Sequence, residues 1–409
     1  MKKRSYSPDT VRKLQGTQKI EHTIAQDMAV KLRKLFSENV YVNTFGAYNG
    51  QQAVQHVKAG LKAIYCSGWQ VAAAANSSNE VYPDQSLYPV DSVPTVVRNI
   101  NSAFRRQDQI EYAETGHGFD FAPIVADAEA GFGGVLNSYE LARNLIEAGA
   151  AGVHFEDQLA SAKKCGHLGG KVLIPLSDAV RNLNAARLAA DVCGTETLII
   201  ARTDAESARL LSSDHCAADQ KWIKRHHQGT ASVRSRTSDG FWQIEGGLDM
   251  GCERGAAYAE YADLVWCETS TPCLKEARRF ADAVKGSCGE AMLAYNCSPS
   301  FNWRKSIPGD QELQDFQYEL GKMGFKFQFI TLGGFHSTNL AVFNFARQYK
   351  HQDMLAYSDL QEAEFHAENY GYTSTKHQRE VGVGYFDEIT KALGSSTEAL
   401  KDSTEAEQF

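Results

Sequence analysis

The chain has 409 residues, 43% of them hydrophobic, which is enough to bury the core of one large domain or two ordinary ones. Its formal net charge of -8, with 42 lysines and arginines dispersed along the sequence, argues against a nucleic-acid partner. Since no apolar stretch has the length of a membrane span or a signal peptide, we expect a soluble protein with no membrane partner.

Nine cysteines are scattered along the chain without any C-x-x-C spacing. Three of them, Cys66, Cys267 and Cys297, lie in apolar runs that resemble buried strands. Reduced, unpaired thiols fit this pattern better than a disulfide framework or a structural zinc site. We therefore expect a cytoplasmic location.

Eight short apolar runs recur along the chain, and most are followed by an amphipathic stretch long enough for a helix. The runs cover residues 40–45, 63–66, 123–126, 152–155, 197–201, 264–267, 292–295 and 325–330. The helices expected between them cover residues 51–60, 92–106, 138–148, 177–192, 251–261, 274–284 and 311–323. Apolar strands alternating with helices predict a parallel sheet covered on both faces, and eight such units match an α/β fold, the TIM-type (β/α)8 barrel. Because strand counting from one sequence is error-prone, a doubly wound open sheet is the alternative.

These elements divide the chain into three parts. We expect an N-terminal helical segment at residues 1–39, the barrel at residues 40–350, and a C-terminal helical segment with a lid tail at residues 351–409. An insertion of about residues 206–246 follows the fifth strand and contains the polar, basic stretch 213–243. Read alone, that stretch is an anion-binding patch, but a solvated insertion that projects from the barrel is the better interpretation.

In a barrel of this type the active site lies at the C-terminal ends of the strands. Short polar segments follow seven successive predicted strands, beginning with the second. Their members include Ser67, Gly68, Trp69, Asp127, Glu129, Glu156, Arg202, Glu268, Asn296, Ser298, Ser300 and Thr331. Ordinary loops would not place acids at one strand end and an arginine at another directly after apolar residues, so we expect one active site here.

Four carboxylates in or near these segments indicate a hard divalent cation. Asp127, Glu129 and Glu156 follow the third and fourth strands, and Asp84 lies in a nearby loop. Oxygen ligands without converging histidines favour Mg²⁺ or Mn²⁺ over zinc, and Mg²⁺ takes only one or two carboxylates directly. We expect one acid to bind the metal and the others to hold metal-bound water. The alternative is that some of these acids pair with arginine or lysine at the barrel rim.

The segment 163–167 places the thiol of Cys165 beside Lys163, Lys164 and His167. Flanking cations lower the pKa of a cysteine, so this neighbourhood predicts an easily ionised thiol. Glycines at 166, 169 and 170 let the backbone approach a ligand and give the loop the mobility of a lid. The alternative is a surface loop with an incidental cysteine.

Six motifs in this order resemble the isocitrate lyase family over nearly the whole chain. They are SGWQ at 67–70, YPDQSLYP at 82–89, KKCGH at 163–167, ARTDA at 201–205, NCSPSFNW at 296–303 and TKHQRE at 375–380. The resemblance implies a (β/α)8 barrel, a homotetramer that exchanges helices between subunits, and Mg²⁺-dependent cleavage of isocitrate to glyoxylate and succinate in the glyoxylate cycle. It also implies that the segment beyond Gly371 packs over a neighbouring subunit's site.

This cleavage is a retro-aldol reaction, which needs a base for the substrate hydroxyl, a Lewis acid for the oxyanion and an acid for the succinate carbanion. The resemblance implies Asp127 as the metal ligand and Cys165 as the thiol that protonates succinate. Tyr65 and His167 are the two candidates for the base, and Glu268 orients a cation or a water. The substrate is a small tricarboxylate, whose binding residues by resemblance are Ser67, Gly68, Trp69, Gly166, His167, Arg202, Asn296, Ser298, Ser300 and Thr331.

Two other functions stay open at this point. A 2-methylisocitrate lyase shares the barrel, the metal and the thiol, although it usually carries arginine where this chain has Lys164. A non-catalytic relative that senses a metabolite or the redox state through Cys165 is the second alternative.

For Ser298 and Ser300 taken alone, capping the turn at Pro299 is an alternative to substrate binding. Trp69 and Trp303 also have a packing alternative.

Overall fold

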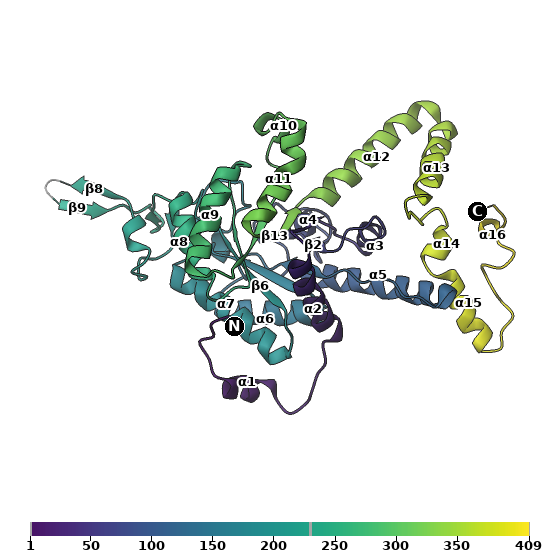
Figure 1. Ribbon diagram of the computed structural model, residues 1–409, viewed down its shortest axis with the longest axis horizontal. Coiled ribbons are helices and arrows are strands. Elements are labelled where there is room, and N and C mark those ends of the chain that lie inside the picture. The colour runs from purple at the N-terminus through teal and green to yellow at the C-terminus, as the bar shows by residue number, and fades with distance from the viewer. Residues whose placement is uncertain (1, 229–230, 409) are drawn as a thin grey trace.

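The computed structural model describes residues 2–228 and 231–408 and contains the expected barrel (Figure 1). All eight predicted strands are present: β1 (Val42–Phe45), β2 (Ile64–Cys66), β3 (Ile124–Asp127), β4 (Gly152–Glu156), β6 (Leu198–Thr203), β11 (Leu264–Cys267), β12 (Met292–Asn296) and β13 (Phe325–Ile330). They pair in the order β1-β13-β12-β11-β6-β4-β3-β2. A parallel bridge between Gly46 and Tyr65 joins the two end strands, and the Ala47 N–H donates to the Tyr65 carbonyl over 3.0 Å. The sheet therefore closes into a nearly complete barrel, and the open-sheet alternative is wrong.

The strands are mostly apolar because both faces of most of them are buried. Val125 and Ile200 belong to a buried cluster with Trp266 and Phe329, which fills the barrel interior. Ile199, the residue before Ile200, belongs instead to the cluster between the strands and the outer helices. Alternate residues therefore serve two cores, as the period of two in a strand requires.

Seven helices match the predicted ones. They are α3 (Gly50–Lys58), α5 (Ser92–Thr115), α6 (Val135–Glu147), α7 (Leu176–Cys193), α8 (Leu248–Tyr258), α9 (Leu274–Ser287) and α11 (Asp310–Met323). Helix α5 continues past Arg106 to Thr115 because its first stop signal is Gly116. That glycine adopts a left-handed φ of 74°, and its N–H donates to the Tyr112 carbonyl.

The N-terminal segment contains α1 (Pro8–Gln15) and α2 (Thr23–Glu38). Ala29, Leu32 and Phe36 of α2 join the interior cluster of the barrel. Helix α2 therefore closes the end of the barrel opposite the C-terminal ends of the strands.

The C-terminal segment leaves the barrel as an arm of two long helices, α12 (Gly333–Gln352) and α13 (Met354–Glu368), seen at the upper right of Figure 1. Three short helices follow: α14 (His377–Glu380), α15 (Val383–Ala392) and α16 (Thr404–Gln408). This last part lies at the far end of α5, where Arg379 pairs with Glu114. The proposed three-part division of the chain stays a prediction.

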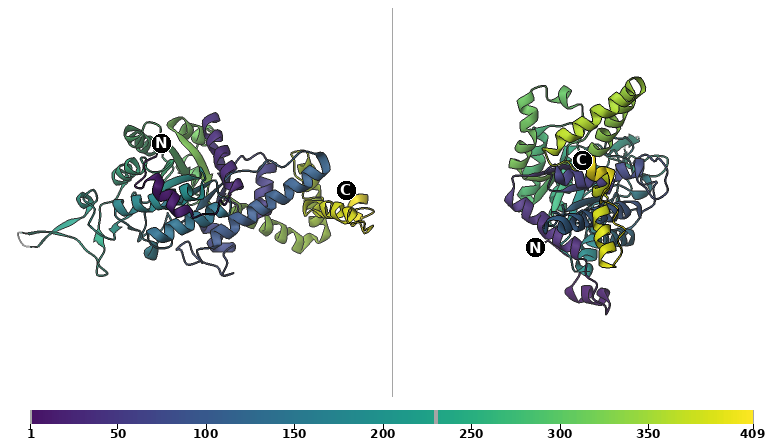
Figure 2. Two further views of the ribbon diagram at one scale, coloured as in Figure 1. Left: turned by 90° about the horizontal axis from the view of Figure 1, so that it is seen from below. Right: turned by 90° about the vertical axis from the view of Figure 1, so that its right-hand side faces the viewer.

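The insertion after β6 projects from the barrel, as expected, and ends in the hairpin of β8 (Arg225–Gln228) and β9 (Ala231–Arg234) (Figures 1 and 2). At its base, β7 (Leu210–Leu211) pairs with β10 (Trp242–Gln243) and with β5 (Val172–Leu173). Strand β5 follows the Cys165 loop directly, so the insertion is joined to that loop. Among the described residues, none of the helices is both long and apolar enough to cross a membrane.

Candidate active site

A cavity at the C-terminal ends of the barrel strands collects most of the predicted site residues. Its lining consists of Tyr65, Ser67, Trp69, Asp84, Asp127, Cys165, Gly166, His167, Arg202, Glu268, Asn296, Ser298, Pro299, Ser300, Thr331 and Leu332. Three predicted residues, Gly68, Glu129 and Glu156, do not line it. Gly68 and Glu129 contact Asp127 through their N–H groups, and Glu156 pairs with Arg202.

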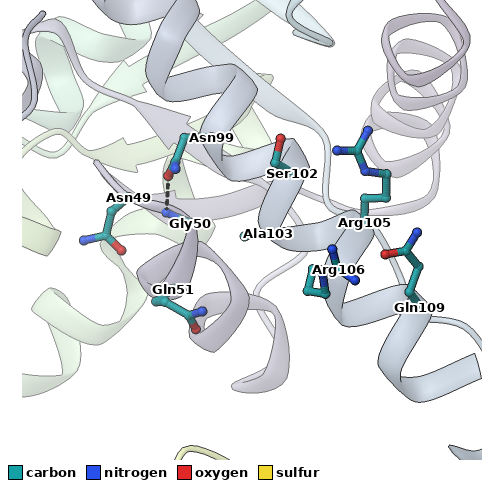
Figure 3. A pocket seen from close by; sticks show the side chains of 9 residues that line it. All are labelled: Asn49, Gly50, Gln51, Asn99, Ser102, Ala103, Arg105, Arg106 and Gln109. Atoms are coloured by element: carbon teal, nitrogen blue, oxygen red, sulfur yellow. Dashed lines mark hydrogen bonds between the residues drawn. The ribbon is translucent and has the colours of Figure 1, made fainter. Parts of the chain in front are cut away.

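A second pocket lies outside the barrel, between α3 and α5 (Figure 3). Its only hydrogen bond between the drawn residues runs from the Gly50 N–H to the Asn99 side chain, over 2.8 Å. None of its nine labelled residues is an acid, a histidine or a cysteine. It therefore lacks the groups that acid-base or metal chemistry requires. The barrel cavity is the candidate active site because it collects most of the predicted site residues.

Lys163 is the centre of a buried acidic cluster. Its ammonium group pairs with Asp84 and Glu129 and lies 3.8 Å from Glu156 Oε1. The Tyr88 hydroxyl donates to Glu129 over 2.5 Å. Burial raises the pKa of Glu129 well above its usual value and that of Glu156 to about 8. Sequence reasoning placed Lys163 beside the thiol and missed this inward role.

For Asp84, Glu129 and Glu156 the structure shows the rim-pairing alternative, with Asp84 bound by Lys163. Glu129 is bound by Lys163 and Tyr88, and Glu156 Oε2 lies 3.1 Å from Arg202 Nη1. Their role in holding metal-bound water stays a prediction.

Asp127 faces the cavity as an oriented carboxylate. It accepts hydrogen bonds from the N–H groups of Gly68 and Glu129 over 3.0 and 2.8 Å. Although burial opposes ionisation, His154, Lys163 and the Glu129 N–H lower the pKa of Asp127. A side chain at position 68 would place its Cβ 2.5 Å from Glu129 Oε1, so only glycine allows this approach.

Three carboxylates line the cavity: Asp84, Asp127 and Glu268. Glu268 is engaged with His167 and Asn296, which leaves Asp84 and Asp127 as the oxygen donors toward a cation. Two oxygen donors suit a hard cation that keeps several waters. Within the described residues, no group of three or more His, Cys, Asp or Glu side chains is arranged around one metal position. The donor set therefore fits an open, partly hydrated Mg²⁺ or Mn²⁺ site rather than a closed protein cage.

Cys165 lines the cavity with a thiol that keeps its proton. Burial and the charge of Asp84 raise the pKa of Cys165 to about 12, against the His167 N–H, Lys163 and Arg202. The flanking cations do lower the pKa of this thiol, as expected, but burial outweighs them. A protonated thiol is suited to donate a proton.

The loop that carries Cys165 is closed at its base. The Leu159 N–H donates to the Val172 carbonyl over 2.7 Å. The Gln158 side chain exchanges two hydrogen bonds with the backbone of Lys164, over 2.8 and 3.0 Å. These contacts fix the path of the loop on both sides of the short 3-10 helix η1 (Ala160–Ala162).

Arg202 presents its guanidinium to the cavity from the end of β6. Its Nε and Nη2 each donate to Asp204 over 3.0 Å, and its guanidinium lies 4.7 Å from the ring centroid of Trp266. A Cβ at Gly166 would come within 2.7 Å of Arg202 Nη2. Gly166 therefore lets the Cys165 loop lie directly on the arginine.

His167 is held by Glu268 and Ser298 on the far side of the loop. His167 Nε2 lies 3.1 Å from Glu268 Oε1, and Nδ1 lies 3.4 Å from the Ser298 hydroxyl. Asn296 Nδ2 also donates to Glu268 Oε1, over 3.0 Å. Buried Glu268 Oε2 and Asn296 Oδ1 have no hydrogen-bond partner in the described part of the chain. Unsatisfied polar atoms beside a cavity are what a bound polar ligand would satisfy.

Ser298 also has the turn-capping role that the sequence left open, since its hydroxyl accepts from the Ser300 N–H over 3.1 Å. Trp303 packs edge-on against Phe301 and Phe316, and its indole N–H donates to the Ser298 carbonyl. Trp303 therefore packs around the pocket and supports its turn. Trp69 both lines the cavity and packs on Phe335 of α12, with ring centroids 4.9 Å apart.

His154 is a site residue that sequence reasoning missed. Its Nε2 lies 2.9 Å from the Tyr65 hydroxyl and 3.5 Å from Asp127 Oδ1. Burial lowers the pKa of His154 to about 4 and raises that of Tyr65 well above its usual value. A neutral imidazole therefore faces a phenol that keeps its proton. The available signal was position, because His154 precedes Glu156 by two residues and so shares its face of the strand.

The chain is similar to known proteins over nearly its whole length. The model of the isocitrate lyase family matches residues 1–229 and 231–409. An isocitrate lyase from Halalkalibacterium halodurans is 57% identical over 410 residues, which cover 99% of this chain and 94% of that protein. Isocitrate lyase 1 from Mycobacterium tuberculosis is 54% identical over 410 residues, with the same coverage.

Solved structures show the same architecture at lower identity. A 2,3-dimethylmalate lyase of the PEP mutase/isocitrate lyase superfamily superposes with a TM-score of 0.60 and 20% identity, over 90% of this chain and 96% of that chain. A phosphoenolpyruvate phosphomutase from Streptomyces platensis gives a TM-score of 0.58 and 19% identity, over 90% of this chain and 99% of that chain. These likenesses show the shared barrel fold.

Proposed function

The chain belongs to the isocitrate lyase family, and we propose that the cavity at its barrel mouth is where it cleaves isocitrate to glyoxylate and succinate. The chain is thus a carbon-carbon lyase that acts on a small-molecule substrate, not a metabolite or redox sensor. One observation supports the position of the site. The cavity brings together a thiol, an arginine and three carboxylates, namely Cys165, Arg202, Asp84, Asp127 and Glu268.

Metal dependence is a property of this family. We assign Asp127 as the direct ligand of Mg²⁺, with Asp84 beside it, because two backbone N–H groups orient the Asp127 carboxylate at the cavity. The third lining carboxylate, Glu268, is engaged with His167 and Asn296. When bound there, the cation supplies a Lewis acid that stabilises the oxygen of the glyoxylate half. The backbone N–H of Glu129 orients Asp127, and this contact does not depend on the Glu129 side chain.

The remaining residues supply anion recognition. Arg202 and His167 are cationic or hydrogen-bonding groups in the cavity lining, and Asn296, Ser298 and Thr331 add amide and hydroxyl donors from the ends of β12 and β13. A tricarboxylate requires several such donors in a site with little water. We assign the second group to the succinate half, together with Ser300, and Ser67, Gly68 and Trp69 to the glyoxylate half.

Cleavage begins when a base takes the proton of the substrate hydroxyl, and the carbon-carbon bond then breaks with its electron pair left on the succinate half. We assign the first step to Tyr65, whose hydroxyl contacts the neutral imidazole of His154. Tyr65 lines the cavity, whereas His167 is engaged with Glu268 and Ser298. Cys165 completes the reaction by donating its thiol proton to the succinate carbanion.

We propose a homotetramer in which the C-terminal arms are exchanged. On the arm, Leu340, Val342, Phe343 and Leu355 each expose 61–64% of their surface. Exposed apolar side chains on two adjoining helices are typical of a surface covered by another subunit. No residue beyond Leu332 in the described chain lines the cavity, so a lid formed by residues 372–408 would cover a neighbouring site. The cytoplasmic location stays a prediction.

Release of glyoxylate from isocitrate, measured with and without EDTA, tests the function. We expect metal-dependent release by the wild type, and loss of turnover in Cys165→Ser with substrate binding retained. Glu290→Gln, an exposed change at the opposite end of the barrel, is the matched control and should leave turnover unchanged. Absence of metal-dependent glyoxylate from the wild type would overturn the proposal.

A further inference from the structure

The side chain of Lys171 is completely buried at the point where the Cys165 loop returns to the barrel. Its ammonium group donates to Asp204 Oδ1 and to the Ser207 hydroxyl, each over 2.8 Å. A buried lysine needs such partners, because an unpaired ammonium in this position would cost several kcal/mol.

Asp204 links this lysine to the cavity. Its two oxygens accept from Nη2 and Nε of Arg202, each over 3.0 Å, in a bidentate arrangement. Although burial opposes ionisation, Arg202 and Lys171 hold the pKa of Asp204 far below its usual value. Asp204 is therefore a buried carboxylate shared between two cations, of which only Arg202 reaches the cavity.

The carboxylate itself sits on a fixed support. The Asp204 N–H donates to Asp157 Oδ1 over 2.9 Å, and the hydroxyl of Thr203 donates to Asp157 Oδ2 over 2.7 Å. Asp157 is further bound by Arg254 and by the Tyr258 hydroxyl, over 3.0 and 2.9 Å. These bonds fix the ends of β4 and β6 relative to each other, so Asp204 has little freedom to follow a displaced partner.

Lys171 also fixes the loop. It directly precedes β5, which pairs with β7, and it follows the exposed glycines 169 and 170. Arg202 and Gly166 touch at the other end of the same loop. The Lys171–Asp204 pair thus joins the returning stem of the loop to the arginine on which the loop lies.

We propose that Lys171 and Asp204 are positioning residues that act as one unit. They fix the Arg202 guanidinium relative to the Cys165 loop, so that both contact the same bound substrate. This inference rests on the proposed function of the cavity. Neither residue lines the cavity, so both act through Arg202 and the loop. A lost charge-assisted hydrogen bond at Arg202 should weaken substrate binding about 10- to 100-fold.

Steady-state kinetics on isocitrate with saturating Mg²⁺ test the pair. In Lys171→Met and in Asp204→Asn we expect KM to rise about 10- to 100-fold, with a smaller fall in kcat. The double variant should be no worse than the more affected single variant, because the two residues act as one unit.

Arg187→Met is the matched control. Arg187 and Asp263 form another buried ion pair, each side chain 6% exposed, at the opposite end of the barrel. We expect this variant to lower the unfolding midpoint and to leave KM within about twofold, because a merely structural pair does not touch the cavity. Should Lys171→Met not fold, Lys171→Gln is measured in the same way.

The outcomes distinguish the proposed function of the cavity from the positioning role of Lys171 and Asp204. A wild type that releases no glyoxylate contradicts the proposed function. An active wild type whose KM is unchanged in Lys171→Met, or raised equally in Arg187→Met, contradicts the positioning role alone. Additive effects in the double variant, or failure of both Lys171 variants to fold, also contradict it.

Discussion

The ammonium group of Lys163 lies between the carboxylates of Asp84 and Glu129, so the first lysine of the KKCGH motif faces inward. The neighbouring thiol of Cys165 is buried, and burial raises its pKa despite the nearby cations. The inward lysine and the protonated thiol determine the first two predictions.

Replacing Lys163 with Met should destabilise the fold. The side chain is 1% exposed, and its loss leaves two buried acids without their cation, which costs about 3–5 kcal/mol. Lys164→Met is the control for stability, since Lys164 is half-buried and its Nζ reaches only the Ala162 carbonyl, over 3.4 Å. Urea unfolding of both variants measures the difference, and equal midpoints would contradict the inward role.

The thiol of Cys165 should react slowly with iodoacetamide at neutral pH. Its pKa of about 12 leaves only about one thiolate in 10⁴ at pH 8, and the rate should rise about tenfold per pH unit above that. Mass spectrometry of the peptide that contains residue 165 follows the modification. A rate that levels off near pH 8.5 would show an ordinary thiol.

The stability of the fold should fall as the pH is lowered from about 6.5 to about 4. His56 is 6% exposed and packs on Phe45 with ring centroids 3.9 Å apart. Burial lowers the pKa of His56 to about 4, so in this window the unfolded chain binds a proton that the folded chain does not. Above pH 6.5 His56 is neutral in both the folded and the unfolded chain, and the free energy of unfolding has its full value. By pH 4, protonation of the unfolded chain lowers this free energy by about 3 kcal/mol.

Urea unfolding between pH 4 and pH 7.5 measures this dependence. The variant His56→Phe should show a weaker slope, with part of the slope retained because His154 is also held neutral by burial. An unchanged slope in the variant would assign the pH dependence to other groups.

Removing residues 395–409 should lower turnover while the barrel stays folded. Glu405 accepts hydrogen bonds from the N–H groups of Gln378 and Arg379, over 2.8 and 3.0 Å, at the start of α14. Without it the tail loses its fixed position, and we expect a fall in kcat of about tenfold or more. Glu405→Gln provides the milder comparison, and unchanged turnover of the truncated chain would contradict the lid.

Isocitrate should be preferred over 2-methylisocitrate. One additional methyl group in a pocket of fixed shape is worth about 1–3 kcal/mol, so kcat/KM for the methylated substrate should be lower by about 10- to 200-fold. Parallel assays of glyoxylate and pyruvate release measure this ratio. A ratio near one or in the opposite direction would favour the 2-methylisocitrate lyase alternative.

The sequence predicted the strands well because each strand is buried on both faces. Val125 and Ile200 serve the interior while Ile199 serves the outer core, so both faces of these strands carry apolar residues. The end of α5 was missed because nothing in its composition stops the helix before Gly116. Local signals therefore decided which elements were predicted correctly.

The candidate site was predictable where a residue follows a strand directly, as Asp127 and Arg202 do. The pairings of buried charges were not predictable, because they depend on which distant segment faces which. Lys163 and Asp84 are far apart in sequence, as are Lys171 and Asp204, and each pair meets only in the closed barrel. His154 was not predicted as a site residue for a different reason, since a single polar residue in an apolar strand usually has a packing role.

The closure of the barrel also bears on how the chain is made. The first strand pairs with the last, as Val42 opposite Phe327 shows. A ribosome adding 5–20 residues per second needs about 15 to 60 seconds to synthesise the chain between these two strands. Throughout that time one edge of β1 lacks its final neighbour, which makes the nascent barrel a substrate for chaperones until β13 emerges.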